Sequence, residues 1–296
     1  MKGLICGIKR MEIHDGDGLR TTVFFKGCPL RCVWCHNPES ISPKAQIAVF
    51  ENKCLQCGVC SDVCVTGAIK KGAVDFSKCT ACGTCAEECP TEAISLYGEE
   101  WEDAALFEYI MQDAPFFKGG RGGITLSGGE CLMQADFAIS LAKMCFDAGI
   151  SVNIDTSGYV PRETLEKILP YIDTFLYDIK AIDPGVHKAC TSRDNALILE
   201  NLEFLTKSGA KIEIRIPLVV GYNDVDEEKI AKYLSTLENI KKVKVLRYHP
   251  YAKSRYGALG MPCKLPEALT EYSHVSNFVA LLRSYGLYAT DGESED

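Results

Sequence analysis

Two runs of cysteines with the same spacing restrict how the first third of this chain can fold. The stretch "CLQCGVCSDVC" begins at Cys54 and "CTACGTCAEEC" begins at Cys79, so each of four thiols recurs 25 positions later. Neither run contains enough apolar residues to fold around a core of its own. A segment of roughly 50 residues with this composition usually needs covalent or metal cross-links to be stable. The repeat therefore predicts a small metal-stabilised domain over residues 46–97.

The spacing also indicates which metal centres these thiols hold. Bacterial ferredoxins use Cys-x2-Cys-x2-Cys-x3-Cys for two 4Fe-4S clusters, with the fourth thiolate of each run crossing to the other cluster. Zinc is the alternative, but zinc sites more often use paired Cys-x2-Cys units with longer gaps. The ligands expected for one cluster are Cys54, Cys57, Cys60 and Cys89. Those expected for the other are Cys79, Cys82, Cys85 and Cys64.

The overall composition argues against several classes of protein. The formal net charge is -8 and no Lys/Arg-rich run is present, so we expect no binding to nucleic acid. The apolar stretch at the N-terminus is too short for a signal peptide, and no run of ~18 apolar residues could span a membrane. We therefore expect a cytoplasmic protein. Because that compartment is reducing, the 16 cysteines indicate metal or redox chemistry rather than disulfides.

Outside the cysteine repeat, short β-branched runs alternate with stretches of helical periodicity. The expected strands are residues 20–27, 123–129, 151–158, 174–180, 211–221 and 242–250. Helical spacing of apolar residues between them ends near Gly149 and again near Gly209. Strand followed by helix, repeated about six times, is typical of parallel strands with right-handed crossovers. We predict an α/β fold, a partial (β/α)6 barrel over residues 1–45 and 98–296, with the ferredoxin-like domain inserted into it.

Unusual residues cluster where the expected strands end. In parallel α/β folds, the carboxyl ends of the strands meet at one edge, and the chemistry gathers there. The residues at or after these ends are Cys28, Cys32, Cys35, Ser127, Gly128, Gly129, Glu130, Asp155, Thr156, Ser157, Gly158, Asp178, Lys180 and His249, with Arg215 inside the fifth strand. This edge is therefore the expected active site.

Three of these thiols form an uneven group, Cys28-x3-Cys32-x2-Cys35. A 4Fe-4S cluster has four irons, so three thiolates leave one iron without a protein ligand. An open coordination position distinguishes a catalytic metal site from a closed structural one. The spacing alone leaves three alternatives: a zinc site completed by His36, a fourth thiolate from Cys6, and plain structural thiols.

The surrounding residues carry a family resemblance. Cys-x3-Cys-x-aromatic-Cys, with Trp34 as the aromatic residue, resembles the signature of radical S-adenosylmethionine (SAM) enzymes. The longer stretch "HDGDGLRTTVFFKGCPLRCVWCHNPES" is similar to activating enzymes of glycyl radical enzymes, such as the pyruvate formate-lyase activase. The resemblance covers almost the whole chain, and the insertion is similar to that of activases for the larger glycyl radical enzymes.

The resemblance implies a reaction, three 4Fe-4S clusters and two kinds of partner. The amino and carboxylate groups of SAM would chelate the open iron, and one electron would cleave SAM to methionine and a 5'-deoxyadenosyl radical. That radical would remove a hydrogen atom from the Cα of a glycine in a partner glycyl radical enzyme. Glycine has no side chain to hinder the approach of the radical. The electron would come from an external reductant such as flavodoxin or ferredoxin, and the enzyme would act as a monomer. The inserted clusters could relay electrons, dock a partner or stabilise the fold.

The resemblance also implies roles for the residues at the strand ends. Gly128, Gly129 and Glu130 match a motif that holds the SAM amino group, although Cys131 replaces the proline that usually follows. A buried small side chain is the expected role of Cys131. The residues that match a monovalent cation site beside the SAM carboxylate are Asp155, Thr156 and Asp178, with the carbonyl of Leu176.

Four further positions complete the expected site. Lys180 matches a lysine that contacts SAM. Without the resemblance, Lys180 would be read as an ordinary ion-pair partner of Asp178. His249 matches a histidine near the adenine or ribose. Arg215 lies in a strand and needs a charged partner, either the SAM carboxylate or a nearby carboxylate such as Glu130 or Asp178. Asp15, in "HDGDG", matches a position near the incoming glycine loop, although Asp-Gly is also a common turn former.

Two other functions remain open on these residues. One is a radical SAM enzyme that acts on a small molecule or a peptide, and it predicts SAM cleavage without a glycyl radical. The other is a ferredoxin-like electron carrier whose barrel is not catalytic, and it predicts no SAM cleavage.

Overall fold

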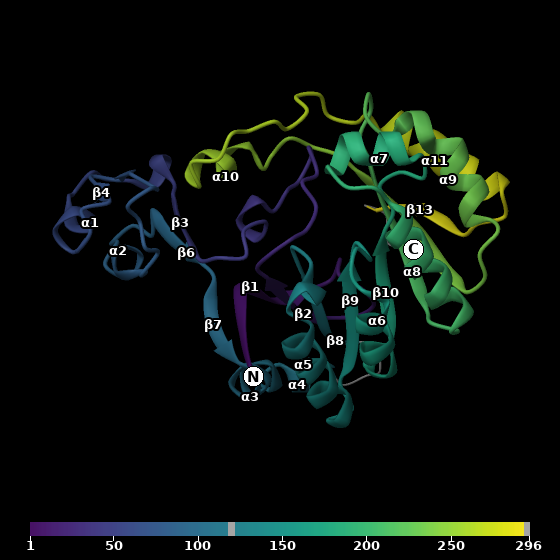
Figure 1. Cartoon of the computed structure of the whole chain (residues 1–296), viewed down its shortest axis with the longest axis horizontal. Helices are drawn as coiled ribbons and strands as arrows, with labels where there is room; N and C mark the ends of the chain where they lie inside the picture. Colours follow the sequence, from purple (N-terminus) through teal and green to yellow (C-terminus); the bar gives the residue numbers. More distant parts are fainter. Residues whose placement is uncertain (118–121, 293–296) are drawn as a thin grey trace.

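The core of the protein is one large sheet, seen in a computed structural model that describes residues 1–117 and 122–292. Nine strands follow the order β13-β12-β11-β10-β9-β8-β2-β1-β7 (Figure 1). The parallel strands are β2 (Arg20–Phe25), β8 (Gly123–Gly128), β9 (Ser151–Thr156), β10 (Thr174–Asp178), β11 (Ile212–Leu218), β12 (Ile240–Arg247) and β13 (Ala289–Asp291). Antiparallel to β2 lies β1 (Lys2–Glu12), which pairs in turn with β7 (Glu99–Glu102). The predicted α/β fold with a mostly parallel sheet is confirmed.

All six expected strands are present, and they end one to three residues earlier than expected. The residues beyond these ends leave the sheet and form the loops at its carboxyl edge. The sequence analysis missed β1, β7 and β13. β1 mixes exposed and buried residues without a regular alternation, and β13 has only 3 residues.

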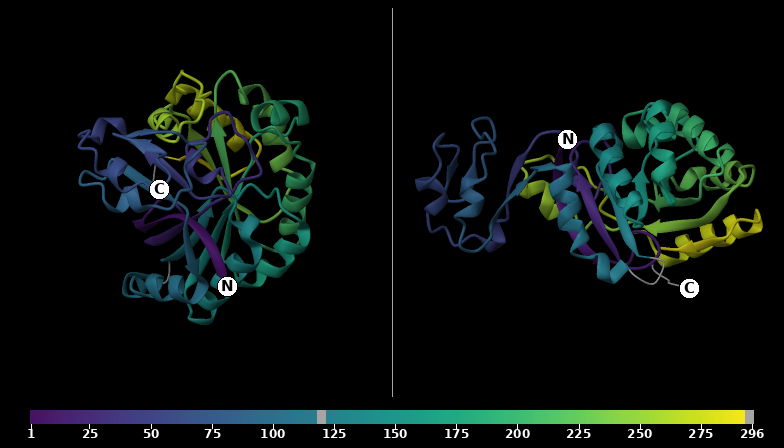
Figure 2. Two further views of the ribbon diagram at one scale, coloured as in Figure 1. Left: turned by 60° about the vertical axis from the view of Figure 1, so that its left-hand side comes forward. Right: turned by 90° about the horizontal axis from the view of Figure 1, so that it is seen from below.

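Helices connect the parallel strands and cover the outside of the curved sheet (Figure 2). They are α3 (Asp103–Met111), α4 (Ala114–Phe117), α5 (Ala135–Asp147), α6 (Arg162–Ile168), α7 (Pro184–Thr191), α8 (Ala196–Lys207), α9 (Glu227–Leu234) and α11 (Tyr272–Ser284). A further short helix, α10 (Lys253–Ala258), lies apart from this layer, beside residues 38–40 and 46–49 (Figure 1). Gly149, with φ +72°, follows the end of α5, and Gly209, with φ +74°, follows α8, as the sequence predicts.

The two faces of the sheet differ because side chains alternate along each strand. In β11, Ile212, Ile214 and Ile216 are fully buried in the apolar core beneath the helices. Complete burial of one such side chain contributes about 1.5–3 kcal/mol. Glu213 and Arg215 point to the opposite side, and the other parallel strands follow the same rule. We call this second side the polar face, and the loops at its carboxyl edge form the candidate site.

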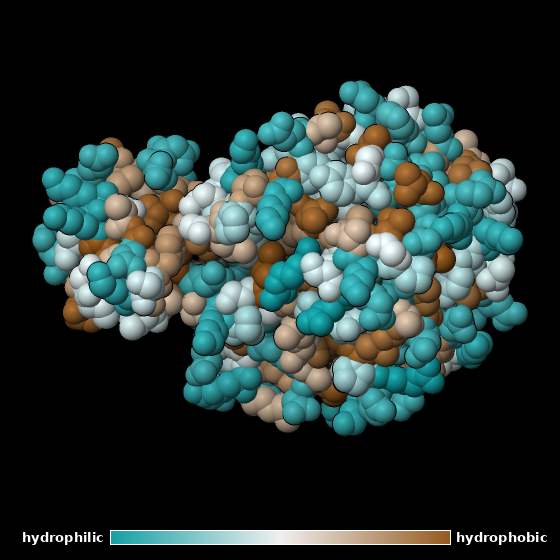
Figure 3. Space-filling view, turned by 45° about the horizontal axis from the view of Figure 1, so that its top comes forward, coloured by the Kyte–Doolittle hydropathy of each residue, from teal (hydrophilic) through white to brown (hydrophobic). Residues whose placement is uncertain are grey.

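Residues 46–97 form a separate lobe that projects from one end of the sheet (Figures 1 and 3). We call it the inserted lobe. Its base is a pair of antiparallel strands, β3 (Gln46–Val49) and β6 (Ile94–Tyr97). The remaining elements are β4 (Ile69–Lys70), β5 (Ala73–Val74), α1 (Val59–Asp62) and α2 (Thr84–Glu87).

The sequence repeat has a structural counterpart in this lobe. α1 starts after Gly58 and α2 starts after Gly83. Both glycines adopt the left-handed backbone conformation, with φ angles of +93° and +91°. Only glycine adopts such angles at little cost, so the two glycines allow the same turn in both halves. The small apolar core of the lobe contains Ile47, Val49, Cys60, Ile69, Cys85 and Ile94.

Within the residues that the structure describes, no helix is long and apolar enough to cross a membrane.

Candidate active site

A cavity of about 440 Å³ opens at the carboxyl ends of the parallel strands. Its wall combines loops after β2, β8, β9 and β10 with residues of β11 and β12 and the segment after β12. The predicted site residues that line it are Cys28, Cys32, Trp34, Cys35, Gly128, Gly129, Asp155, Thr156, Asp178, Lys180, Arg215 and His249. Asp15 and Glu130 are not part of its wall. The fold therefore brings together segments that are far apart in the sequence.

The three thiols lie on one loop, residues 28–40, which we call the thiol loop. The backbone N–H of Arg31 donates to the carbonyl of Thr191 at 2.8 Å, and the N–H of Val33 donates to that of Cys190 at 2.9 Å. Trp34 is 5% exposed and packs in an apolar cluster that includes Cys190. The end of α7 therefore fixes the first half of the loop.

The thiols of this loop are protonated in the metal-free protein. Burial raises the pKa of Cys28 and of Cys35 to about 12. Burial also raises the pKa of Cys32, although the nearby Lys180 ammonium opposes this shift. Because metal ligation requires thiolates, loading a metal centre here would release protons.

The arrangement of donors fits a cluster better than a single ion. Among the described residues, no group of three or more His, Cys, Asp or Glu side chains surrounds a position for one metal ion. A cluster does not need such convergence, because each sulfur binds a different iron. His36 lines the cavity, but its Nε2 donates to the carbonyl of His249 at 2.7 Å. Cys6 is not part of the wall of the cavity.

Gly128 and Gly129 form a tight turn against the end of β2. Gly128 has φ +114°, and a Cβ there would lie 2.2 Å from the backbone nitrogen of Phe25. A Cβ on Gly129 would lie 2.3 Å from the carbonyl oxygen of Gly27. Any larger residue at either position would therefore push the strand ends apart. The turn leaves backbone, rather than side chains, at this side of the cavity.

Glu130 joins two loops instead of facing the cavity. Its side chain is fully buried and accepts hydrogen bonds from the Thr156 hydroxyl at 2.8 Å and from the Ser157 N–H and hydroxyl at 2.9 and 2.7 Å. Burial raises the pKa of Glu130, and these hydrogen bonds oppose that shift. Cys131 is fully buried. Glu130 therefore orients Thr156, which does line the cavity.

Lys180 supplies a buried positive charge in the wall. Its Nζ lies 2.9 Å from Oδ2 of Asp178, and the lysine is 8% exposed. Burial alone would lower the pKa of Lys180, but Asp178 and the Cys32 thiol raise it above its ordinary value. The side chain is therefore a permanent cation beside the thiol loop.

Asp155 lies next to other carboxylates on the polar face. It accepts a hydrogen bond from the Ser127 hydroxyl at 2.7 Å and lies 3.9 Å from Nη1 of Arg215. Burial raises the pKa of Asp155. Arg215 lowers it, whereas the Asp178 and Asp15 carboxylates raise it further. Asp155 therefore binds a proton more readily than an ordinary carboxylate, because burial and the neighbouring carboxylates disfavour its charge.

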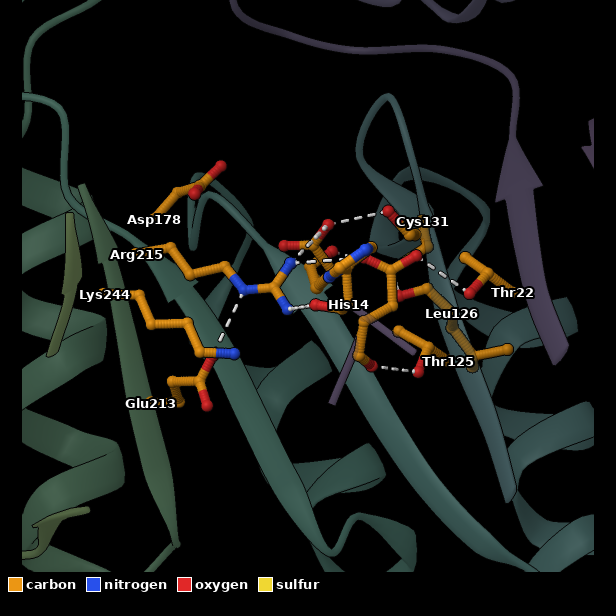
Figure 4. Close-up of polar contacts among 12 residues, drawn as sticks. His14, Thr22, Thr125, Leu126, Cys131, Asp178, Glu213, Arg215 and Lys244 are labelled. Carbon is orange, nitrogen blue, oxygen red and sulfur yellow. Dashed lines mark hydrogen bonds and ion pairs between the residues drawn. The ribbon is translucent and has the colours of Figure 1, made fainter. Parts of the chain in front are cut away.

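Arg215 extends from the cavity wall into the interior of the polar face (Figure 4). Its Nη2 donates to the carbonyl of His14 at 2.9 Å, and its Nη1 lies 3.4 Å from Oδ1 of Asp15. Its Nε lies 3.4 Å from Glu213, whose carboxylate also pairs with Lys244 at 3.3 Å. These partners differ from the carboxylates named in the sequence analysis, because they come from the "HDGDG" segment and from β11 itself.

The "HDGDG" segment fills the polar face beneath the cavity. The Asp15 carboxylate accepts from the Thr22 hydroxyl at 2.9 Å, and its carbonyl accepts from the Thr125 hydroxyl at 2.6 Å. Gly16 has φ +120°, and a Cβ there would lie 2.0 Å from the side-chain nitrogen of Asn153. The glycine therefore lets this segment approach the sheet closely enough for Asp15 to reach Arg215.

Comparison with known proteins agrees with this geometry. A profile of the radical SAM superfamily matches residues 22–234. The trans-4-hydroxy-L-proline dehydratase activating enzyme of Clostridioides difficile is 45% identical over 265 residues, which cover 86% of this chain and 87% of that protein. The choline trimethylamine-lyase activating enzyme of Oleidesulfovibrio alaskensis is 40% identical over 271 residues, 88% of this chain and 87% of that protein. This chain belongs to the radical SAM activating enzymes of glycyl radical enzymes.

The structural comparison agrees with this assignment. A crystal structure of a domain of the pyruvate-formate lyase-activating enzyme from Bacteroides vulgatus matches with a TM-score of 0.50 and 27% identity, over 57% of this chain and 98% of that domain. The family implies a 4Fe-4S cluster and SAM. Activases of this family use SAM to make a 5'-deoxyadenosyl radical, which abstracts a hydrogen atom from a glycine of the partner enzyme.

The activase site contains residues that the sequence analysis missed or gave another role. His36, considered there only as a zinc ligand, stacks on His249 with ring centroids 4.4 Å apart. His249 stacks in turn on Tyr251, also at 4.4 Å. Asn37 and Arg247 line the cavity as well. The polar run "CHNPES" after the third thiol was a usable signal for Asn37, whereas nothing in the sequence pointed to Arg247.

Proposed function

We propose that Cys28, Cys32 and Cys35 hold the 4Fe-4S cluster of this activase and that SAM occupies the cavity beside them. The observation that carries this proposal is that the three thiols, a buried lysine and a backbone edge line one cavity of about 440 Å³. Pockets for small ligands and cofactors typically measure about 300–1,000 Å³. Three thiolates leave one iron free for the amino and carboxylate groups of SAM.

The chain's own residues bind and orient SAM in this proposal. Lys180, a permanent cation in the wall, would pair with the SAM carboxylate. The backbone edge at Gly128 and Gly129 would accept from the SAM ammonium, with Glu130 acting from behind through Thr156. His249 is the proposed contact of the adenine or ribose, and Arg215 adds positive charge at the base of the cavity.

The remaining contribution of the protein is exclusion of water. Once bound, the reduced cluster supplies the single electron that cleaves SAM. Trp34 and the apolar residues around it close the wall behind the thiol loop, which protects a reactive radical from solvent. Asp15 remains our candidate for contact with the glycine loop of the partner, and in this structure it pairs with Arg215.

A monovalent cation is proposed between Asp155, Thr156 and Asp178, with the Leu176 carbonyl as a further ligand. The carboxylates of Asp155 and Asp178 both belong to the cavity wall, and Asp178 contributes to raising the pKa of Asp155, which burial raises most. A cation bound between them would relieve this repulsion. Hard oxygen donors suit such an ion.

For residues 46–97 we propose a ferredoxin-like domain with two further 4Fe-4S clusters, inserted into a partial barrel formed by residues 1–45 and 98–296. Two small cavities in this lobe support the proposal, because each is lined by one of the predicted ligand sets. The first contains Cys54, Cys57, Cys60 and Cys89. The second contains Cys64, Cys79, Cys82 and Cys85. The fourth thiol of each run thus lies with the first three of the other run, as in two-cluster ferredoxins.

The partner enzyme and the reductant are also part of the proposal. The partner is a glycyl radical enzyme, and the names of the similar activases make trans-4-hydroxy-L-proline dehydratase and choline trimethylamine-lyase the first candidates to test. A small one-electron carrier such as flavodoxin or ferredoxin would supply the electron.

The deciding experiment is anaerobic reconstitution followed by three measurements. Iron counting should give about twelve irons per chain, as three clusters of four require. Incubation with SAM and a reductant should release 5'-deoxyadenosine. Mixing with each candidate partner should produce the glycyl doublet in electron paramagnetic resonance (EPR) spectra. SAM cleavage without a doublet for any partner would favour an enzyme acting on a small molecule or peptide, and no cleavage at all would favour an electron carrier.

A further inference from the structure

Two helices contact the thiol loop, α7 at its first half and α10 at its second half. Of the two, only α7 belongs to the layer of helices that covers the parallel sheet. The end of α7 holds the first half through the backbone carbonyls of Cys190 and Thr191. Such backbone contacts depend little on which side chains α7 carries. The second half, from Cys35 to Ser40, has a different support.

That second support is α10, which contacts the loop through two neighbouring side chains. The hydroxyl of Tyr256 donates to the carbonyl of Cys35 at 3.0 Å. Nη1 of Arg255 lies 3.0 Å from Oε1 of Glu39 and 3.4 Å from Oδ1 of Asn37. The last cysteine of the loop and the turn behind it therefore depend on side chains that lie more than 200 positions later in the sequence.

The surroundings make these contacts costly to lose. Tyr256 is 7% exposed, so its hydroxyl is a mostly buried donor, and its removal would take this hydrogen bond from the Cys35 carbonyl. Glu39 is 9% exposed, and its Oε2 is buried with no hydrogen-bond partner among the described residues. Arg255 forms the ion pair with this mostly buried carboxylate, and the buried Lys26 is a second cation nearby, which donates to the Glu39 carbonyl. A buried charge without its partner destabilises its surroundings strongly.

The end of α10 packs against the inserted lobe. Ala258 and Leu259 form a buried apolar cluster with Ala48 of β3. Gly260 lies directly on the ring of Phe76, because a Cβ at Gly260 would be 2.2 Å from Cε2 of that ring. One short segment therefore contacts the thiol loop at one end and the inserted lobe at the other.

We propose that Arg255 and Tyr256 are positioning residues for the site on the thiol loop, and that they transmit to this loop the placement of the inserted lobe. The proposal rests on the assignment of Cys28, Cys32 and Cys35 as cluster ligands, and it gives the lobe a mechanical role besides any clusters it holds. Hydrogen bonding and solvent access near the ligating sulfurs set the potential of such a centre and its affinity for ligands. Displacing the Cys35 end of the loop should alter both.

The first test is Tyr256→Phe, which removes one hydroxyl and keeps the ring. In the metal-free protein, hydrogen exchange of the Cys35, Ser40 and Ile41 amides should become about five- to tenfold faster, because the turn they close has lost a donor. In the reconstituted enzyme, the SAM dissociation constant should rise about tenfold, and the potential of the SAM-binding cluster should shift while those of the inserted clusters stay constant. Tyr285→Phe is the matched control, since its hydroxyl bonds Glu228 at the surface and should leave all these values unchanged.

The second test compares Arg255→Gln with Arg255→Lys. The glutamine removes the ion pair of Glu39, although Lys26 stays nearby, and should reproduce the exchange and affinity changes of Tyr256→Phe. The lysine keeps the charge and should restore SAM affinity to within about threefold of the wild type. Wild-type exchange, affinity and potential in both Tyr256→Phe and Arg255→Gln would overturn the proposal.

The third test concerns the coupling to the lobe. Phe76→Ala removes the ring beneath Gly260 at a position that is 44% exposed, so the lobe should still fold. Exchange should increase in α10 and at residues 35–41, with the iron content unchanged. An increase confined to the lobe would overturn the coupling. Failure of the proposed function would be visible separately, as a wild-type protein that does not cleave SAM.

Discussion

The thiol loop and the inserted lobe both present cysteines that we propose as iron ligands, but they place several of these thiols in opposite environments. Burial raises the pKa of Cys28 and Cys35 to about 12. In the lobe, a hydrogen bond from the Thr66 side chain and nearby backbone donors lower the pKa of Cys64 to about 7. Backbone and side-chain hydrogen bonds from Thr84 lower the pKa of Cys82 in the same way.

This difference matches two uses of the same chemistry. Around the thiol loop, exclusion of water would protect a radical and strengthen electrostatic contacts with SAM, as our proposal requires. In the lobe, Cys57 and Cys82 are exposed, where an external carrier could exchange electrons, whereas Cys60 and Cys85 are buried in its small core. The comparison suggests that the loop is built for a reaction and the lobe for access, and four experiments test this contrast.

The largest effect is expected for Cys32→Ala. It should abolish 5'-deoxyadenosine release and lower the iron content by about four per chain, since one of three clusters loses a ligand. The EPR signals of the two inserted clusters should persist. Cys263→Ser, which changes an exposed free thiol, is the control and should keep full activity. Unchanged release from Cys32→Ala would refute the ligand assignment.

Thiol reactivity should separate the two regions in the metal-free protein. At pH 8 the Cys64 thiol is mostly thiolate, whereas Cys28 and Cys35 are protonated. Alkylation monitored by mass spectrometry should be on the order of a hundredfold faster at Cys64, because the higher intrinsic reactivity of basic thiolates offsets only part of the difference.

The pH dependence of this labelling gives a sign test. Lowering the pH from 8 to 6 protonates Cys64, whose pKa is about 7, and should slow its alkylation about tenfold. Exposed Cys263 provides an accessible reference thiol. Equal rates at Cys28 and Cys64 would show that the two environments do not differ.

A smaller effect is expected for Lys180→Ala. It removes the cation that balances Asp178 and, in our proposal, the SAM carboxylate. A lost hydrogen bond to a charged group corresponds to about tenfold weaker SAM binding or more, measurable by calorimetry under anaerobic conditions. Lys188→Ala, at an exposed position on α7, is the matched control. An unchanged dissociation constant would remove Lys180 from the SAM site.

The smallest effect concerns the proposed monovalent cation. Replacing sodium and potassium by tetramethylammonium at constant ionic strength should weaken SAM binding roughly threefold, as expected for loss of one partly solvated charge interaction. Asp155→Asn should remove this dependence because it lowers the negative charge at the site. A dissociation constant that is the same in all three salts would argue against a cation site.

Much of the fold could be predicted from periodicity. The six expected strands exist because β-branched runs such as residues 212–218 alternate apolar and polar side chains, which suits a sheet with one covered face. The edge strands were harder. β7 contains three glutamates in four residues, and its pairing with β1 is set by tertiary contacts rather than by local preference.

Site residues that belong to an uncommon sequence pattern could be predicted. Contacts that depend on how distant segments pack could not. Three thiols at such short spacing form a distinctive pattern, so the thiol loop was visible in the sequence. Glu130 was expected near the SAM amino group, but its burial against Ser157 places it behind the wall. Of the carboxylates around Arg215, Asp15 was the unpredictable one, because it lies 200 positions earlier in the chain.

The sequence by itself determined the mostly parallel α/β framework and the family, and it predicted the type of metal centre, because cysteine spacing and side-chain periodicity are local properties. Only the tertiary structure decided which charges meet on the polar face and how α10 connects the thiol loop to the inserted lobe. Those contacts depend on how strands and loops pack in three dimensions. The number of residues between two positions does not give their distance in space, so Tyr256 and Cys35 could be recognised as neighbours only in the folded chain.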